Sequence, residues 1–276
     1  MSREGTIALD DGGALSFQIT GEARAGSILL LRPLGGSMAL WSEFAAHLAR
    51  ELEVIAFDPR GVGRSSAAPL TSSTRTMADD ARTLLCKLDR PRAHVFGLSL
   101  GGMVAIWLAA DFPEVVDRLI LASTLPRSGL ISHHAIEDVF SYARCLARPG
   151  VEAEIALVRR ILSRQFRESH PERVASIEAA IRASPTSRRS LCALALAAAR
   201  HNAESALPKI HAPTLIVVGA LDELAGRHSQ EDLVRNIPHE RFVTIPGAGH
   251  DLSLEQPETL ARLVLDFILK RQPVSA

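Results

Sequence analysis

The fold of this chain is decided by residues 93–111, which read AHVFGLSLGGMVAIWLAAD. The first six of these residues are an apolar run of the length expected for a buried strand, and the last nine have the composition of an apolar helix. Between the two lies the pattern G-x-S-x-G, centred on Ser99. A serine on such a strand-to-helix turn is pushed out of the fold, with its hydroxyl accessible. The pattern therefore predicts that Ser99 is a nucleophile.

The backbone of this turn is predicted to contribute as well. Glycines two residues on either side of the serine let neighbouring chain pass close by without a clash. Backbone N–H groups at the start of the following helix have no partner within the helix, so they can stabilise a negatively charged oxygen. The alternative interpretation is a glycine-rich helix start in which Ser99 is only an N-cap. The strand before it and the helix after it favour the nucleophile.

A serine nucleophile needs an imidazole to take its proton and a carboxylate to orient that imidazole. Asp222 follows the apolar run 214–218, and His250 follows the run 242–245. Because parallel strands end at the same edge of a sheet, we expect both side chains to meet Ser99 there. The sequence therefore predicts a catalytic triad of these three residues.

Two other carboxylates compete for the role of the acid. Glu223 adjoins Asp222, and Asp251 adjoins His250. A residue next to the histidine in the chain rarely reaches the far side of the imidazole, which disfavours Asp251. We therefore expect Asp222 to be the acid, with Glu223 as its nearest rival.

Strands and helices alternate along most of the remaining chain. The first two predicted strands flank Asp10-Asp11-Gly12-Gly13, a turn sequence typical of an antiparallel hairpin. The later apolar runs are continuous, as expected for parallel strands covered on both faces. The predicted strands are 6–9, 14–20, 28–31, 54–57, 93–98, 119–122, 214–218 and 242–245. We expect an α/β fold with a mostly parallel eight-stranded sheet and helices on both faces.

The alternation stops between residues 127 and 206. Helical patterns such as 155–166 and 191–201 occur in this stretch, and we find no convincing strand in it. We therefore predict a core domain made of residues 1–126 and 207–276. Residues 127–206 are predicted to form a helical cap, or lid, inserted after the sixth strand.

Charge and composition exclude several classes of protein. The chain of 276 residues carries 31 basic and 31 acidic residues, so it lacks the positive field that a nucleic-acid partner requires. No apolar stretch approaches the length of a membrane span, and the N-terminus does not resemble a signal peptide. The three cysteines are not at metal-ligand or redox spacing, and no P-loop occurs. We expect a cytoplasmic protein with neither metal nor organic cofactor, and the sequence leaves a homo-oligomer open.

These features together resemble the α/β-hydrolase fold family over essentially the whole chain outside the predicted cap. Residues 32–36, Arg-Pro-Leu-Gly-Gly, occupy the loop that in most such enzymes carries His-Gly and then an oxyanion donor. The resemblance implies that the backbone N–H groups of Leu34 and Leu100 form the oxyanion hole. Residues 57–65, FDPRGVGRS, resemble a glycine-rich loop of the family, which we interpret as structural and fixed by its aspartate and first arginine.

A narrower resemblance is to the 3-oxoadipate enol-lactonases. It rests on Pro33-Leu34-Gly35 with Trp41 a few residues later, on the segment 166–172 of the predicted cap, and on Leu207-Pro208-Lys209-Ile210. A Gly-Tyr pair expected near residues 190–192 is absent. The resemblance implies a serine hydrolase that cleaves a small ester or lactone through an acyl-enzyme.

Candidate substrate contacts are polar or aromatic side chains near the oxyanion loop and in the predicted cap. They are Arg32, Trp41, Phe140, Tyr142 and Phe166. An arginine such as Arg32 would pair with the carboxylate of an acidic substrate. The same triad also serves thioesterases, acyltransferases, carbon–carbon bond hydrolases and perhydrolases, and a small-molecule receptor can keep the fold without turnover.

Overall fold

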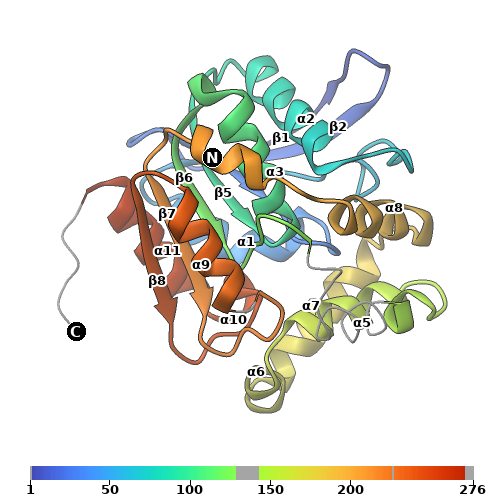
Figure 1. The fold of residues 1–276 in the computed structure, drawn as a ribbon. Helices are drawn as coiled ribbons and strands as arrows, with labels where there is room; N and C mark the ends of the chain where they lie inside the picture. Colours follow the sequence, from blue (N-terminus) through green and yellow to red (C-terminus); the bar gives the residue numbers. More distant parts are fainter. Residues whose placement is uncertain (1, 129–142, 226, 271–276) are drawn as a thin grey trace.

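A computed structural model of the chain describes residues 2–128, 143–225 and 227–270 (Figure 1). Within these residues, eight strands form one sheet in the order β1-β2-β4-β3-β5-β6-β7-β8. The strands are β1 (Ser2–Ala8), β2 (Ala14–Thr20), β3 (Ser27–Leu31), β4 (Glu53–Phe57), β5 (Ala93–Leu98), β6 (Val116–Ala122), β7 (Thr214–Gly219) and β8 (Glu240–Ile245). β2 pairs antiparallel with β1 and β4, and every other pair is parallel. The predicted eight-stranded, mostly parallel sheet is confirmed.

Helices cover both faces of the sheet, as predicted. On one face lie α2 (Thr74–Lys87), α3 (Leu100–Asp111) and α9 (Arg227–Asn236), and on the other lie α1 (Ser42–Leu48) and α11 (Pro257–Ile268). Successive residues of a strand point to opposite faces, so Leu29 packs with the first group of helices and Leu30 with the second. Four shorter helices are η1 (Met38–Trp41), η2 (Pro113–Val115), η3 (Glu204–Lys209) and α10 (Leu252–Glu255).

Among the described residues, four α-helices of six or more residues lie between β6 and β7 and are grouped together beyond the sheet in Figure 1. They are α5 (Glu152–Ile161), α6 (Arg164–Ser169), α7 (Pro171–Ala183) and α8 (Arg188–Ala199). We refer to residues 143–206 as the helical segment, and no strand occurs in it. The division into core and cap after residues 126 and 206 stays a prediction, and its second boundary falls inside η3. In the described part of the chain no helix is long and apolar enough to cross a membrane.

The helix predicted over residues 155–166 is wrong as a single helix, because α5 and α6 separate at Ser163. The hydroxyl of Ser163 accepts a hydrogen bond from the N–H of Phe166 at 3.1 Å and so caps α6. The N–H and the hydroxyl of Ser163 each donate to the buried carboxylate of Glu255 at 2.7 Å. The break therefore depends on a partner 92 residues away, which the local hydrophobic pattern cannot reveal.

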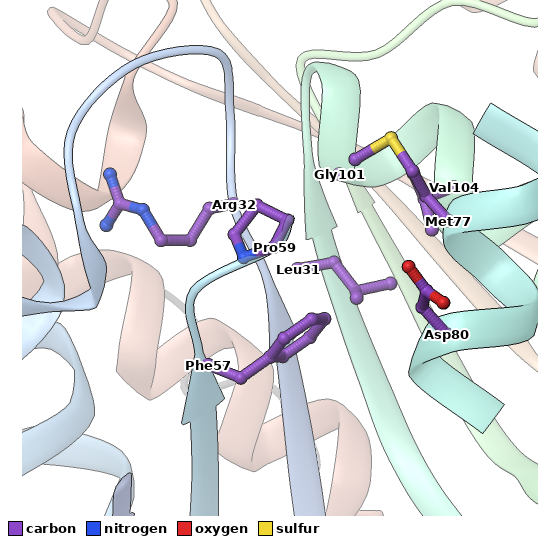
Figure 2. Close-up of a pocket in the computed structure, with 8 residues that line it drawn as sticks. All are labelled: Leu31, Arg32, Phe57, Pro59, Met77, Asp80, Gly101 and Val104. Carbon is purple, nitrogen blue, oxygen red and sulfur yellow. The ribbon is translucent and has the colours of Figure 1, made fainter. Parts of the chain in front are cut away.

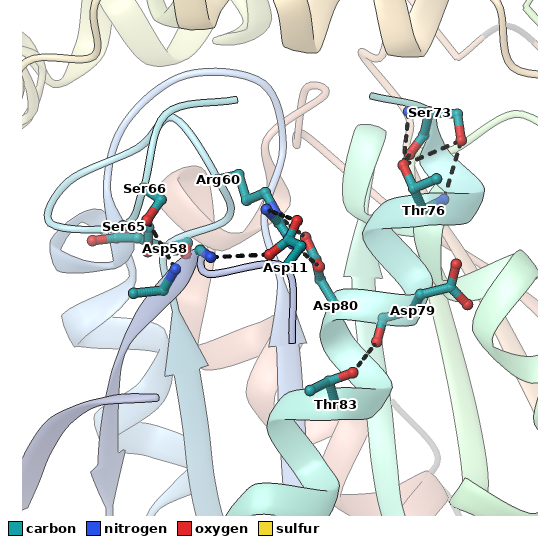
Figure 3. Close-up of polar contacts among 12 residues, drawn as sticks. Asp11, Asp58, Arg60, Ser65, Ser66, Ser73, Thr76, Asp79, Asp80 and Thr83 are labelled. Atoms are coloured by element: carbon teal, nitrogen blue, oxygen red, sulfur yellow. Dashed lines mark hydrogen bonds and ion pairs between the residues drawn. The ribbon is translucent and has the colours of Figure 1, made fainter. Parts of the chain in front are cut away.

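The loop after β4 is fixed by Asp58 and Arg60, as its interpretation as a structural turn predicts. Arg60 binds both carboxylate oxygens of Asp80 on α2, at 2.8 and 2.9 Å, and reaches Asp11 at 2.7 Å (Figure 3). Asp58 accepts a hydrogen bond from the N–H of Met38 at 2.7 Å. The loop thereby ties the β1–β2 hairpin to α2 and to η1, the helix that follows the Arg32–Gly36 loop.

The start of α3 packs directly against the end of β3. A Cβ added at Gly101 would clash with the backbone carbonyl of Leu31, and one added at Gly97 would clash with the carbonyl of Gly101. Only glycine fits at either position. This close approach fixes the direction in which α3 leaves β5, and with it the position of Ser99.

Replacement of Gly101 by alanine is expected to destabilise the protein by about 3 kcal/mol or more, because backbone atoms block the added Cβ. The control is Gly150→Ala, where nothing lies within 4 Å of the added Cβ. There only the left-handed φ of +54° opposes the substitution, at a cost of about 1–2 kcal/mol. Chemical denaturation gives both free energies of unfolding, and equal losses would contradict the tight packing of α3 on β3.

Candidate active site

Ser99 lies between β5 and α3 in a conformation that few residues other than glycine adopt. Its φ is +54° and its ψ is −116°. Its N–H donates to the carbonyl of Ala122 at 2.9 Å, and its own carbonyl accepts from the hydroxyl of Thr124 at 2.7 Å. These two bonds to the end of β6 hold the strained turn in place. A turn of this kind is what the G-x-S-x-G pattern predicts.

The structure brings His250 into contact with Ser99. The Nε2 atom of His250 lies 2.8 Å from the Oγ atom of Ser99, and the imidazole is only 6% exposed. The backbone on either side of His250 is also held. The N–H of Gly249 donates to Glu255 at 2.9 Å, and the N–H of Asp251 donates to the carbonyl of Ile161 at 3.2 Å. The imidazole is thus fixed by both the core and the helical segment.

Asp222 completes the group from the loop after β7. Its two carboxylate oxygens lie 3.0 and 3.1 Å from the Nδ1 atom of His250, and its side chain is fully buried. The N–H groups of Leu224 and Ala225 donate to the same carboxylate at 2.9 and 3.0 Å. An acceptor at Nδ1 keeps the proton on that nitrogen, so Nε2 is free to accept the proton of Ser99.

The two rival carboxylates point elsewhere. The side chain of Glu223 is 78% exposed and lies 3.8 Å from Arg160. Asp251 accepts hydrogen bonds from the hydroxyl of Ser253 and the N–H of Leu254, at 2.5 and 3.2 Å, and so caps α10. The geometry therefore favours Asp222 as the partner of the imidazole.

Burial and charge act in opposite directions on this pair. Burial opposes ionisation of Asp222, but the charge and hydrogen bond of His250, with the N–H of Ala225, outweigh it and lower the pKa to about 2. Burial likewise opposes protonation of His250, but the charge and hydrogen bond of Asp222 raise its pKa above the ordinary value of 6.5. Asp222 is therefore ionised at neutral pH, and it stabilises a positive charge on His250.

The two predicted oxyanion donors lie in one apolar cluster. Leu100 is the first residue of α3, a position whose N–H has no acceptor within a helix. Its side chain packs with Val62, Met103 and Leu194, and Leu34 packs against the same cluster. The loop after β3 and the start of α3 therefore meet beside Ser99, and the role of their N–H groups stays a prediction.

Of the five predicted substrate-contact residues, the three that lie in the described parts of the chain are buried. Phe140 and Tyr142 lie outside the described residues. Trp41 and Phe166 are 1% and 5% exposed and belong to the apolar core. Arg32 is 5% exposed, with its guanidinium 4.9 Å from the ring of Trp41. Trp41, Phe166 and Arg32 therefore pack in the interior, but the Nε1 atom of Trp41 and the Nε and Nη1 atoms of Arg32 are buried without a hydrogen-bond partner among the described residues. Substrate contact by any of the five stays a prediction.

One hollow lies beside His250, and another lies near the start of α3. The larger, of about 70 Å³, opens beside His250 and is lined by side chains of the helical segment that include Arg160, Arg164 and Arg167. The smaller, of about 20 Å³, lies between the ends of β3 and β4 and the helices α2 and α3 (Figure 2). The smaller one contains neither Ser99 nor His250 and has room for about one water molecule.

Sequence reasoning missed a buried carboxylate of the helical segment, Glu154. This residue is 0% exposed and accepts a hydrogen bond from the N–H of Gly36 at 2.6 Å. One signal was available, because Glu154 lies four and seven residues before Val158 and Ile161, on the apolar face of α5. In the described residues, no group of three or more His, Cys, Asp or Glu is placed to hold a metal ion.

Replacement of Asp222 by asparagine is expected to lower the pKa of His250 below 6.5. The substitution removes the negative charge, and the burial of the imidazole then dominates. NMR titration of the His250 ring protons in wild type and variant measures both pKa values. An unchanged pKa would contradict the electrostatic coupling between the two side chains.

Comparison with known proteins gives the family to which the chain belongs. Residues 26–257 match the sequence profile of a family described as alpha/beta hydrolase fold. A protein of Pseudomonas savastanoi pv. phaseolicola that bears the name carbamate hydrolase RutD is 28% identical over 248 residues, which cover 89% of this chain and 95% of that protein. The 3-oxoadipate enol-lactonase 2 of Acinetobacter baylyi is 26% identical over 260 residues, 94% of each chain.

The fold also matches solved structures over nearly its whole length. The enol-lactonase from Burkholderia xenovorans LB400 superposes with a TM-score of 0.85 at 25% identity, over 96% of this chain and 100% of that one. A thermophilic esterase from Thermogutta terrifontis superposes with a TM-score of 0.80 at 28% identity, over 97% and 98% of the two chains. Sequence profile and three-dimensional structure agree, and the chain therefore belongs to the α/β-hydrolase fold family.

Proposed function

We propose that this protein is a serine hydrolase that cleaves small esters or lactones through an acyl-enzyme. The observation that carries the proposal is the contact of 2.8 Å between the Nε2 atom of His250 and the Oγ atom of Ser99, with Asp222 on the opposite side of the ring. Similarity to proteins named enol-lactonase and esterase supports an ester or lactone as the substrate.

The proposed reaction begins with transfer of the Ser99 proton to Nε2 of His250. The Oγ atom attacks the carbonyl carbon of the substrate, and the carbonyl oxygen becomes an oxyanion that the N–H groups of Leu34 and Leu100 stabilise. The tetrahedral intermediate collapses when the ester bond breaks and His250 returns its proton to the departing oxygen. Ser99 then carries the acyl group as an ester.

Water completes the cycle by a second attack of the same kind, in which the water molecule takes the place of Ser99 as the nucleophile. His250 takes a proton from water, whose oxygen attacks the acyl carbonyl, and then returns the proton to Oγ of Ser99. Asp222 stays ionised throughout and stabilises the imidazolium in both halves. For a lactone, the departing oxygen stays attached to the acyl chain, so deacylation releases a single hydroxy acid.

The surroundings of Ser99 favour a substrate with a small apolar acyl part. Leu100, the residue after Ser99, packs in an apolar cluster with Met103 and with Leu194 of α8, and Leu34 packs against this cluster. Apolar side chains next to the turn limit the access of water, and a hydrogen bond to an oxyanion is stronger where water is excluded.

The experiment that tests the proposal is a panel of p-nitrophenyl esters, simple lactones and aryl carbamates, with Ser99→Ala as the blank. Turnover of esters or lactones that disappears in the blank would support it. Faster turnover of carbamates would move the substrate class toward that named for the carbamate hydrolase relative. Less than one turnover per site on every compound would favour a receptor on the same fold.

Single substitutions in the triad are expected to lower kcat steeply. In Ser99→Ala and His250→Ala, kcat should fall about 10⁴- to 10⁶-fold, and in Asp222→Asn it should fall somewhat less. Some activity remains in each variant because the oxyanion donors stay in place. Steady-state assays with p-nitrophenyl butyrate measure the losses, and Ser169→Ala, at an exposed serine of α6, is the control. If kcat fell more in Glu223→Gln than in Asp222→Asn, Glu223 and not Asp222 would be the acid of the triad.

The pH dependence of kcat/KM should show one acid limb. A protonated imidazole cannot accept the serine proton, so activity rises tenfold per pH unit until His250 is neutral. Because Asp222 raises the pKa of His250, the inflection is expected above pH 6.5. A profile that stays flat down to pH 5 would show that His250 is not the base.

A further inference from the structure

Two residues of opposite charge hold a single peptide group in the loop between β3 and η1. This peptide joins Gly35 to Gly36. Its carbonyl oxygen accepts a hydrogen bond from the Nη2 atom of Arg32 at 3.2 Å, and its N–H donates to the Oε1 atom of Glu154 at 2.6 Å. The cation thus lies at the negative end of the peptide dipole and the anion at the positive end. The two charges together favour one orientation of the peptide plane.

Arg32 is buried, and only its Nη2 atom has a hydrogen-bond partner, the carbonyl of Gly35, in the part of the chain that the structure describes. Its side chain is 5% exposed and lies over the ring of Trp41. Burial lowers its pKa to about 10, and the nearby charges of Asp251, Asp58 and Glu154 oppose that effect, so Arg32 is protonated at neutral pH. Figure 2 shows its guanidinium pointing away from the hollow that Arg32 shares with Met77.

Glu154 connects the same peptide to the helical segment. Its carboxylate also accepts hydrogen bonds from the N–H and the hydroxyl of Thr186, at 2.7 and 2.6 Å. Thr186 precedes α8, whereas Glu154 lies on α5, so one carboxylate joins two parts of the helical segment to the loop after β3. A buried carboxylate is costly unless donors surround it, and here three donors do so.

The loop needs such a restraint because two glycines follow Leu34. Gly35 and Gly36 have φ angles of +90° and +76°, and glycine reaches many other conformations at little cost. A rotation of their shared peptide would change the path of the chain on both sides. The N–H of Leu34 belongs to the adjoining part of this loop and would move with it.

We propose that Glu154 is a positioning residue for the oxyanion hole: opposite Arg32, it fixes the Gly35–Gly36 peptide and so places the N–H of Leu34. This inference rests on the proposed function. It also makes the geometry of the oxyanion hole depend on docking of α5 and α8. A misplaced donor weakens the transition state, where the oxygen is charged, more than the bound substrate, where it is not.

The test compares Glu154→Gln with Glu152→Gln, an exposed glutamate on the same helix whose carboxylate pairs with Arg182. With p-nitrophenyl butyrate, Glu154→Gln is expected to lower kcat about 10- to 100-fold and to change KM less than about threefold. Glu152→Gln should stay within about twofold of wild type. Titration of active sites with a fluorophosphonate corrects kcat for any misfolded fraction.

Thr186 supplies a second pair of variants that separates positioning from packing. Thr186→Ser keeps the hydroxyl donor and loses a methyl group, whereas Thr186→Val keeps the shape and loses the donor. Positioning predicts that kcat falls more in Thr186→Val, and packing predicts that Thr186→Ser is the worse of the two. Affinity for an aliphatic trifluoromethyl ketone, which forms a hemiketal oxyanion with Ser99, should fall in parallel with kcat.

The outcomes distinguish this inference from the proposed function. A wild-type protein that neither turns over the ester nor reacts with the fluorophosphonate would overturn both. A reactive wild type would overturn this inference alone if Glu154→Gln kept the wild-type kcat per titrated site. A rise in KM with unchanged kcat would likewise overturn it, because the carboxylate would then act on substrate binding.

Discussion

The site depends on the common edge at which the parallel strands end. β5, β6, β7 and β8 pair in parallel, so the loops after β5, β7 and β8 emerge on one side. Ser99 and His250 are 151 residues apart in the chain, yet their reacting atoms are 2.8 Å apart. The register of the parallel strands brings these two distant parts of the chain together. A slip of one residue in any of these strands would turn its side chains to the opposite face and shift the loop that follows.

The placement of these side chains can be predicted from the sequence because each signal is local. A buried apolar run, followed by glycine and one chemically distinctive side chain, identifies Ser99, Asp222 and His250 one at a time. The general rule that parallel strands end together then supplies their meeting point. The structure brings the three side chains together and turns both rival carboxylates, Glu223 and Asp251, to other partners.

Features that depend on distant partners could not be predicted in this way. The break between α5 and α6 at Ser163 requires the carboxylate of Glu255, and the burial of Glu154 requires Gly36, 118 residues away. The sequence places Glu154 on the apolar face of α5, but it does not show which donors would surround a carboxylate buried there. From the sequence, Arg32 is a candidate partner for a substrate carboxylate, because its packing over Trp41 and its bond to Gly35 become visible only after the fold is known.

Ser163 and Thr186 limit what can be transplanted between relatives of this fold. Each presents an N–H and a hydroxyl to a buried glutamate, and each glutamate also binds the backbone of a loop beside Ser99. Consider a chimaera whose helices come from a relative that lacks these two hydroxyl residues. In it, the buried carboxylates of Glu255 and Glu154 would lose hydrogen-bond donors. The helices can therefore be exchanged only together with Ser163 and Thr186. Replacement helices chosen for their length alone would weaken the hold of the two glutamates on the loops at Gly36 and Gly249.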